Sequence, residues 1–371
     1  MHSSSISPKE TSEIYARQIA FCAAFILPMG KLLEVPSLLA SYAKGDILLP
    51  AIVQFLAQTL AILGLLYAAS CSEESLWERI QKRLGKGIVF FYIFFALYYL
   101  FFAILPLLDF EKFVYAAFFD TAPTTFSFGF FFVLLAFVCS KGIKSFSRCA
   151  DLSLFLFLLP FFALIGMALF ETDLTKLLPF FGSSYKELSR AVFRSTPHFS
   201  DALLLFPLIA KLRYKKGDGA KVTVGYGVGG LMTLLFLAVF FGIFSSIAPR
   251  EHYAFSKIAQ YFSALDVLGR IDLVFIYLLS IVLLFYTCLP LLYTTKCISS
   301  LFSLKIKAFP SSFLSLALFF FTLFMNKYYN SFYAVISGRC APIFWFVSYL
   351  PPLLCLLLPK KGDHYAIQTK S

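Results

Sequence analysis

Charged side chains are scarce in this sequence. Only 14% of its 371 residues are charged, whereas an ordinary soluble domain carries about 25%. Hydrophobic residues make up 60% of the chain. This balance excludes an ordinary soluble domain, and it predicts an all-α polytopic membrane protein, since helices satisfy their own backbone hydrogen bonds in lipid.

Grouped cysteines and catalytic groups are also missing. The eight cysteines stand singly, without a C-x-x-C pair and without a histidine at metal-binding spacing, so we interpret them as small apolar fillers. No convergent nucleophile, base and metal-ligand set is visible, and we expect no enzyme, no cofactor and no metal. The polar stretch at 1–12 lacks the pattern of a cleavable signal peptide.

The net charge of +12 raises the possibility of a nucleic-acid partner. However, the basic residues sit in short loops between apolar runs, which is the pattern of the positive-inside rule. If the N-terminus is cytoplasmic, most of the 32 Lys and Arg residues fall in loops on the inner side. We therefore expect no nucleic acid, and a multi-pass protein of the bacterial inner membrane with both termini in the cytoplasm.

Ten apolar windows approach the length needed to cross a bilayer, about 20 residues. The third can extend through Asp109 to Phe119, and the fourth is short. The windows are 19–43, 47–70, 87–108, 124–140, 150–170, 188–211, 222–248, 271–295, 308–325 and 341–358.

The first and sixth windows are interrupted. Pro28-Met29-Gly30 breaks the first, with Lys31 and Glu34 close behind, and Ser195-Thr196-Pro197-His198 breaks the sixth. Broken helices five spans apart are typical of inverted-repeat transporters, whose substrate site lies where the helices unwind. We predict a five-plus-five repeat in one transporter-like domain. Its parts are a first repeat at 1–172, a second at 173–358 and a tail at 359–371.

The breaks supply most of the candidate substrate-binding residues, because unwinding frees backbone groups. Aromatic and hydroxyl side chains of the third and eighth windows could flank the same site. The alternatives are a proline kink whose backbone groups a neighbouring helix satisfies, and tyrosines of an interfacial belt. The candidates are Leu27, Pro28, Met29, Gly30, Tyr98, Tyr99, Phe102, Ser195, Thr196, Pro197, His198, Tyr277 and Ser280.

Glu34 and His198 are the candidate protonatable groups. Glu34 could pair with Lys31 or face a vestibule, or it could be solvated near the outer surface. His198 could carry a coupling proton or hydrogen-bond a ligand. The alternative for His198 is a helix cap, a role that Asp201 could fill as well.

Four glycines recur in the seventh window, Gly225, Gly227, Gly229 and Gly230. No strand precedes them and no Gly-Lys-Ser/Thr follows, so a phosphate-binding loop is excluded. The spacing predicts close helix packing through small residues.

Ten spans with breaks in the first and sixth resemble the amino acid–polyamine–organocation (APC) transporter superfamily, which has the LeuT-like fold. Within it, the chain is similar to the spore-germination receptor B subunits (GerAB-like). The stretches that carry this resemblance are QIAFCAAFILPMGKLLEVPSLLASYAKGDILLPAIVQFLA at 18–57, KRLGKG at 82–87, KGIKSFSRCADLSLF at 141–155 and ALDVLGRIDLVFIYLLSIVLLFY at 264–286.

The resemblance implies a receptor subunit that binds a small nutrient, an amino acid or a sugar, in a transporter-like pocket and triggers spore germination. It also implies a location in the inner spore membrane and partners of two kinds, a larger A subunit and a lipoprotein C subunit. The alternative is a proton- or sodium-coupled amino acid permease. Either way, the partners we expect are a small-molecule ligand and the lipid bilayer.

Overall fold

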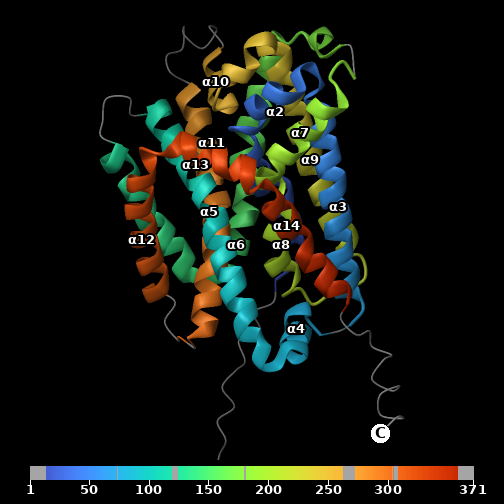
Figure 1. The fold of residues 1–371 in the computed structure, drawn as a ribbon, viewed down its shortest axis with the longest axis vertical. Coiled ribbons are helices and arrows are strands. Elements are labelled where there is room, and N and C mark those ends of the chain that lie inside the picture. Colours follow the sequence, from blue (N-terminus) through green and yellow to red (C-terminus); the bar gives the residue numbers. More distant parts are fainter. Residues whose placement is uncertain are drawn as a thin grey trace, which may run out of the picture.

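The computed structural model describes residues 14–72, 74–118, 124–178, 181–261, 272–302, 304 and 308–357. Within these ranges every regular element is a helix and no strand occurs. The longer helices run side by side along the long axis of the molecule (Figure 1). The prediction of an all-α protein is therefore confirmed for the part of the chain that the structure describes.

The long helices coincide with the predicted apolar windows. They are α3 (Leu48–Ser70), α5 (Ile88–Phe118), α6 (Thr124–Leu169), α9 (Asp218–Phe244), α11 (Asp272–Leu301), α12 (Ala308–Asn326) and α14 (Ala341–Leu356). α5 continues past Asp109, as the extended third window predicted. α6 contains the fourth and fifth windows, and it is interrupted at Gly142, whose φ of 79° is left-handed.

Seven helical segments of the described chain are long and apolar enough to cross a membrane, with α6 counted as two segments and α14 not counted. The number is eight when the bent pair Ala16–Lys31 and Val35–Asp46 counts as one span. Two predicted windows fall short of this test. The sixth is divided into two short helices, and the tenth, α14, has 16 residues. The count of ten spans and the five-plus-five repeat therefore stay predictions.

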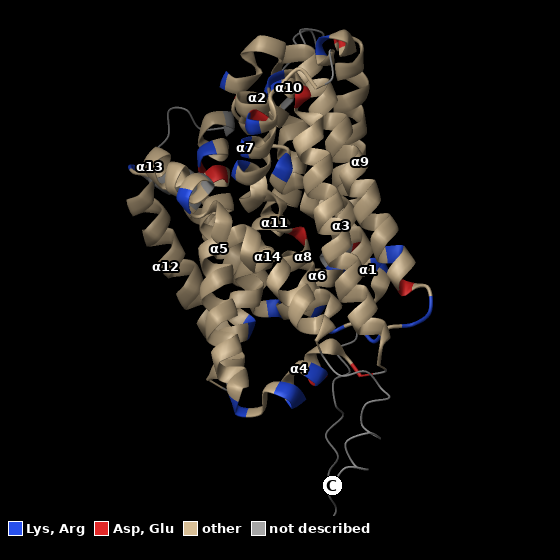
Figure 2. Ribbon diagram, turned by 45° about the vertical axis from the view of Figure 1, so that its right-hand side comes forward, with Lys and Arg blue, Asp and Glu red and all other residues tan. Residues whose placement is uncertain are grey.

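Several short helices connect the long ones. Three of them, α4 (Leu76–Leu84), α10 (Ala254–Tyr261) and α13 (Tyr329–Ala334), lie outside the predicted windows or in a loop between them. Lys and Arg residues lie mainly toward the two ends of the bundle, the end that carries α4 among them (Figure 2). The other short turns are η3 (Lys44–Asp46), η4 (Gly85–Gly87), η5 (Leu174–Leu177), η7 (Ser245–Arg250) and η9 (Val335–Arg339).

Two glycines of α9 lie directly against the backbone of the first broken helix. A Cβ atom on Gly225 would stand 2.6 Å from the Ala20 carbonyl oxygen, and one on Gly229 would stand 2.6 Å from that of Ala23. Only glycine fits such an approach, so the predicted close packing is confirmed at these two positions. It is wrong for Gly227, because a Cβ there would meet no atom within 4 Å.

Candidate functional site

The first break follows from its prolines and its glycine. α1 (Ala16–Phe21) widens into a π-helical turn, η1 (Cys22–Ile26), and then tightens into a 3₁₀ turn, η2 (Leu27–Lys31). α2 (Val35–Ala43) starts afresh at a 60° bend. Pro28 and Pro36 lack the N–H that would continue the α-helical ladder. The predicted interruption of the first window is confirmed.

Neighbouring groups satisfy most of the backbone that this break frees. The carbonyls of Leu32 and Leu33 accept hydrogen bonds from the backbone N–H groups of Phe255 and Ala254, at 3.1 and 3.0 Å. The Leu27 carbonyl accepts a bond from the Lys31 side chain at 3.3 Å. The backbone carbonyls of Leu27, Leu32 and Leu33 are thus held by protein partners.

The second break separates α7 (Tyr185–Ser195) from α8 (Asp201–Ile209) by a 3₁₀ turn, η6 (Thr196–Phe199). Two glutamines of α3, one turn apart, support it. Gln54 donates to the Val192 carbonyl at 2.6 Å, and Gln58 accepts from the Ala202 N–H at 2.9 Å. Because each glutamine replaces a lost backbone partner, the pair explains two polar residues that are buried in an otherwise apolar helix.

Tyr99 is part of the same support. Pro207 has no N–H to donate to the Leu203 carbonyl four residues earlier, and the Tyr99 hydroxyl donates to that carbonyl at 2.9 Å instead. Tyr293 donates likewise to the Leu204 carbonyl at 2.8 Å. Tyr99 is buried and holds the broken helix in this structure.

An ion pair joins the two breaks. The Lys31 ammonium lies 2.7 Å from a carboxylate oxygen of Asp201, and each side chain is only 1% exposed. The second carboxylate oxygen accepts a hydrogen bond from the Tyr226 hydroxyl at 2.7 Å. The expectation that Asp201 caps α8 through its side chain is replaced by this tertiary contact. Lys31 is 170 residues away in the sequence.

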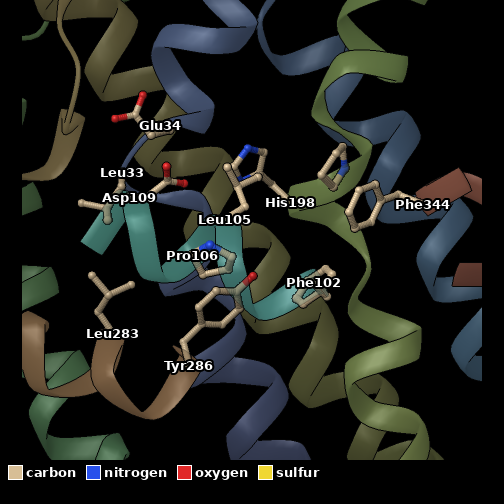
Figure 3. Close-up of a pocket in the computed structure, with 12 residues that line it drawn as sticks. Leu33, Glu34, Phe102, Leu105, Pro106, Asp109, His198, Leu283, Tyr286 and Phe344 are labelled. Atoms are coloured by element: carbon tan, nitrogen blue, oxygen red, sulfur yellow. The ribbon is translucent and has the colours of Figure 1, made fainter. Parts of the chain in front are cut away.

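The two breaks also meet at a small space inside the bundle, which we call the central cavity. It holds about 20 Å³, room for a single water molecule. Its walls come from both breaks, α5, α11 and α14. The lining residues are Gly30, Leu33, Glu34, Phe102, Leu105, Pro106, Asp109, Pro197, His198, Leu283, Tyr286 and Phe344 (Figure 3).

Tyr286 closes the space beside Gly30. A Cβ atom on Gly30 would stand 2.2 Å from the ring carbon that carries the Tyr286 hydroxyl. Residue 30 must therefore be glycine as long as the Tyr286 ring lies in its present position. The cavity is small because an aromatic side chain fills the place next to the unwound backbone.

Four of the predicted substrate-binding residues line the cavity: Gly30, Phe102, Pro197 and His198. The others of the two breaks are buried outside it, namely Leu27, Pro28, Met29, Ser195 and Thr196. The hydroxyls of Ser195 and Thr196 are turned to the Val192 carbonyl, at 3.1 and 3.0 Å. Tyr98 does not line the cavity, and its ring stacks on that of Phe102, with ring centroids 6.4 Å apart.

The expectation for α11 needs correction. Tyr277 is 61% exposed, and the Ser280 hydroxyl bonds to the Ile276 carbonyl of its own helix at 2.7 Å. The face of α11 that meets the cavity carries Leu283 and Tyr286 instead. These two residues are three positions apart and thus lie on one side of the helix.

Two carboxylates stand at one end of the cavity, and Phe102 and Phe344 stand at the other, with His198 between them (Figure 3). Glu34 lies 3.1 Å from Nδ1 of His252, so the possible pairing of Glu34 with Lys31 is wrong. Asp109 accepts a hydrogen bond from the Tyr329 hydroxyl at 2.8 Å. The hydrogen bond to Glu34 is the largest influence on His252, and it raises the pKa of that imidazole.

His198 is buried, and among the described residues no hydrogen-bond partner lies within reach of its Nε2 atom. Unpaired buried polar atoms are uncommon and call for an explanation. Since the side chain lines the central cavity, a water molecule or a ligand there could complete its bonding.

A larger opening adjoins the central cavity, and Glu34 lines both. We call it the vestibule. It encloses about 420 Å³, within the usual range of small-molecule sites, about 300–1,000 Å³. Glu34 is the residue that lines both spaces, and its partner His252 lines the vestibule. The vestibule is lined by Glu34, Ser37, Leu38, Ser41, Tyr42, Lys112, Pro249, His252, Tyr253, Tyr329, Asn330 and Tyr333.

Sequence reasoning missed Asp109, Tyr286 and Phe344 as lining residues. Asp109 had a visible signal, because a carboxylate inside an apolar run is a functional candidate by default. Tyr286 and Phe344 had none, since aromatic residues make up 19% of the chain.

A model of the family described as spore germination protein matches residues 23–331. The chain belongs to this family of spore germination proteins. No curated protein matches it by sequence.

Solved structures show which fold this spore germination protein has. It is similar to a mutant of the Eremococcus coleocola manganese transporter, with a TM-score of 0.55 and 13% identity over 92% of this chain and 76% of that one. The same transporter in complex with an aromatic bis-isothiourea substituted compound matches over the same shares, with a TM-score of 0.52 and 15% identity. At such low identity the likeness establishes the fold alone, which this chain shares with the manganese transporter.

Proposed function

We propose that this spore germination protein is the B-type subunit of a germinant receptor, which binds a small nutrient in its transporter-like core and triggers germination. The observation that carries the proposal is the central cavity. It lies where the two helix breaks meet, it is small, and it combines apolar walls with ionisable groups. Family membership supports the same function.

The chemistry of the lining favours an amino acid over a sugar. Glu34 and Asp109 would attract an ammonium group, and the unpaired Nε2 atom of His198 would bond to a carboxylate or a hydroxyl. Phe102 and Phe344 would accept an apolar side chain.

Binding requires the protein to open. A cavity of about 20 Å³ cannot hold an amino acid, so Tyr286 has to withdraw from Gly30. The Glu34–His252 pair has to part as well, to join the cavity to the vestibule. The signal to partner subunits would then be the difference between this closed state and an open one.

The membrane arrangement that we propose is ten spans in two inverted repeats of five, with both termini in the cytoplasm. Two features support it: the likeness to transporters of this fold and the excess of Lys and Arg in the loops on the side that would carry both termini. We further propose an inner spore membrane location and association with an A-type and a C-type subunit.

A second candidate function is a proton- or sodium-coupled amino acid permease. The transporter fold favours it, and buried carboxylates beside the cavity could bind the coupling proton. The two functions differ in whether the chain alone moves its ligand across the membrane.

The deciding experiment uses liposomes that contain only the purified chain, a set of radiolabelled amino acids, and a proton gradient that is present or absent. Saturable binding without accumulation supports the receptor. Accumulation against a gradient would support the permease. Co-purification of A-type and C-type subunits with the tagged chain from spores would test the receptor reading separately, and their absence from the complex would contradict it.

A further inference from the structure

An apolar groove opens between α5 and α14, and we call it the α5–α14 groove. It measures about 480 Å³, within the usual range of small-molecule sites, about 300–1,000 Å³. Phe95, Phe206 and Cys355 form its floor and are at most 2% exposed. Phe90 and Leu357 stand at its edges and are 78% and 77% exposed. Buried residues at the bottom and exposed residues at the edges make it a groove and not a flat helix face.

The charge in the groove is confined to one end. Arg83 of α4 is an exposed lining residue, and its guanidinium forms no ion pair within the described part of the chain. The other lining residues of the described chain are apolar or glycine. A long apolar surface with a free guanidinium at its end is complementary to an amphiphilic anion, because arginine binds phosphate and carboxylate groups.

α4 marks the level of the bilayer surface. Leu76 and Ile80 on one face of this short helix are buried, whereas Lys82 and Arg83 are exposed. A helix with an apolar face and a basic face lies in the plane of the interface. Trp77 packs against aromatic rings of α5, and tryptophan is enriched at that level. α4 lies at the lower end of the bundle (Figure 1), so the groove begins where lipid headgroups are found.

From α4 the groove extends into the hydrocarbon layer. Its walls follow α5 from Phe90 to Phe95 and α14 from Leu350 to Leu357. At 1.5 Å per residue the longer wall measures about 10 Å. The hydrocarbon core of a bilayer is about 30 Å thick, so the groove lies within one leaflet. This is the course of an acyl chain whose headgroup stays at the surface.

We propose that the α5–α14 groove binds an anionic phospholipid, with its phosphate on Arg83 and one acyl chain against Phe95 and Phe206. The bound chain holds α5, α8 and α14 together and so stabilises the folded protein. The same α5 and α14 carry Phe102 and Phe344 of the central cavity. The inference goes beyond the proposed function and does not depend on it, because no described residue lines both the groove and the cavity.

The test compares two lipids that differ only in the headgroup. The purified full-length chain in an uncharged detergent is melted with increasing phosphatidylglycerol or phosphatidylcholine of identical acyl chains. A ligand that binds only the folded state raises the Tm with saturation. We expect a rise of several degrees with phosphatidylglycerol, a smaller rise with phosphatidylcholine, and one retained phosphatidylglycerol per chain in native mass spectrometry. Glycerol phosphate, the headgroup without acyl chains, should have no effect.

Two variants separate the charge from the groove. Arg83→Gln should abolish the difference between the two lipids. Gly87→Leu places a side chain at the mouth of the groove, where a Cβ atom would meet no atom within 4 Å, and it should abolish the response to phosphatidylglycerol. The matched controls are Lys86→Gln, an exposed basic residue outside the groove, and Gly227→Leu, an equally open glycine of α9. Both controls should respond as the parent does.

Three results would overturn the proposal. Equal losses in Lys86→Gln and Arg83→Gln would show a general attraction to the basic end of the bundle. A fatty acid of the same chain length that stabilises the parent as strongly as phosphatidylglycerol would show that the phospholipid is not the ligand. A parent that responds equally to both lipids, or to neither, would leave the groove to an apolar helix of a partner protein. If Gly87→Leu does not fold, Leu354→Trp fills the groove instead, with the same expected loss.

Discussion

Two ion pairs tie the first broken helix to distant parts of the chain, and they differ in their access to water. The Lys31–Asp201 pair is 1% exposed on both sides. The Glu34–His252 pair joins a buried carboxylate to an imidazole that is 62% exposed. We call the buried Lys31–Asp201 pair the dry pair and the partly exposed Glu34–His252 pair the wet pair. Breaking a dry pair is costly because the separated charges cannot be solvated by water. A wet pair can separate and form again at little cost. The first suits a fixed junction, and the second suits a gate.

The largest effect should come from breaking the dry pair on one side only. Asp201→Ala leaves a buried ammonium without its counter-charge, which typically costs about 3–5 kcal/mol. We expect a large fall in Tm and in the yield of folded protein. The combined variant Lys31→Met with Asp201→Leu removes both charges and should recover most of the stability. A single variant as stable as the parent would show that the pair contributes little.

The central cavity can be blocked directly. Gly30→Leu places a side chain where the Tyr286 ring now lies, because even a Cβ atom would approach that ring to 2.2 Å. The variant should reach the membrane and lose its response to nutrient, measured as germination of spores. Gly227→Leu is the matched control, since no atom lies within 4 Å of a Cβ there. An unchanged response of Gly30→Leu would refute the assignment of the site.

His198 lines the central cavity, and its role can be tested in a pH profile. If it carries a proton or bonds the ligand, His198→Gln should flatten the pH dependence of nutrient response or uptake between about pH 5 and 8. The measurement is the response of parent and variant across that range. A variant profile that matches the parent would leave His198 with a structural role at the start of α8.

The smallest effect should come from the wet pair. Because Glu34 raises the pKa of His252, the pair stabilises the folded state below about pH 6.5, and this contribution is lost as the pH rises through the higher folded-state pKa. With the imidazole largely exposed, we expect about 0–1 kcal/mol. His252→Gln should lower the Tm slightly at acidic pH and converge with the parent at alkaline pH. A difference that grows with pH would reverse the assigned sign.

Much of the fold could be predicted from the sequence, because hydrocarbon tolerates few exceptions. Proline, glycine and charge inside an apolar run mark a break whatever surrounds them, and both breaks are where Pro28 and Pro197 predicted. The short helices α4, α10 and α13 carried no comparable signal, since they do not have to match a bilayer. α14 has only 16 residues, so the tenth span stays a prediction.

The contacts of the site were harder to predict than its place. Lys31 and Glu34 are three residues apart, which suggested a local pair, but the 60° bend between them turns the two side chains to different neighbours. Asp201 and His252 then become their partners through tertiary packing alone. The glutamines of α3 are the instructive case. Their isolation in an apolar helix was visible, but their purpose depends on where α7 and α8 separate.

The glycine contacts of α9 have a mechanical consequence. At Gly225 and Gly229 the backbones of two helices touch with no side chain between them, so no rotamer change can absorb a displacement of one against the other. α1 and α9 should therefore move as one rigid body. Any change of angle in the first broken helix should then occur at the bend at residues 32–34. In the first broken helix, α1 then stays fixed against α9, and α2 is the part that moves.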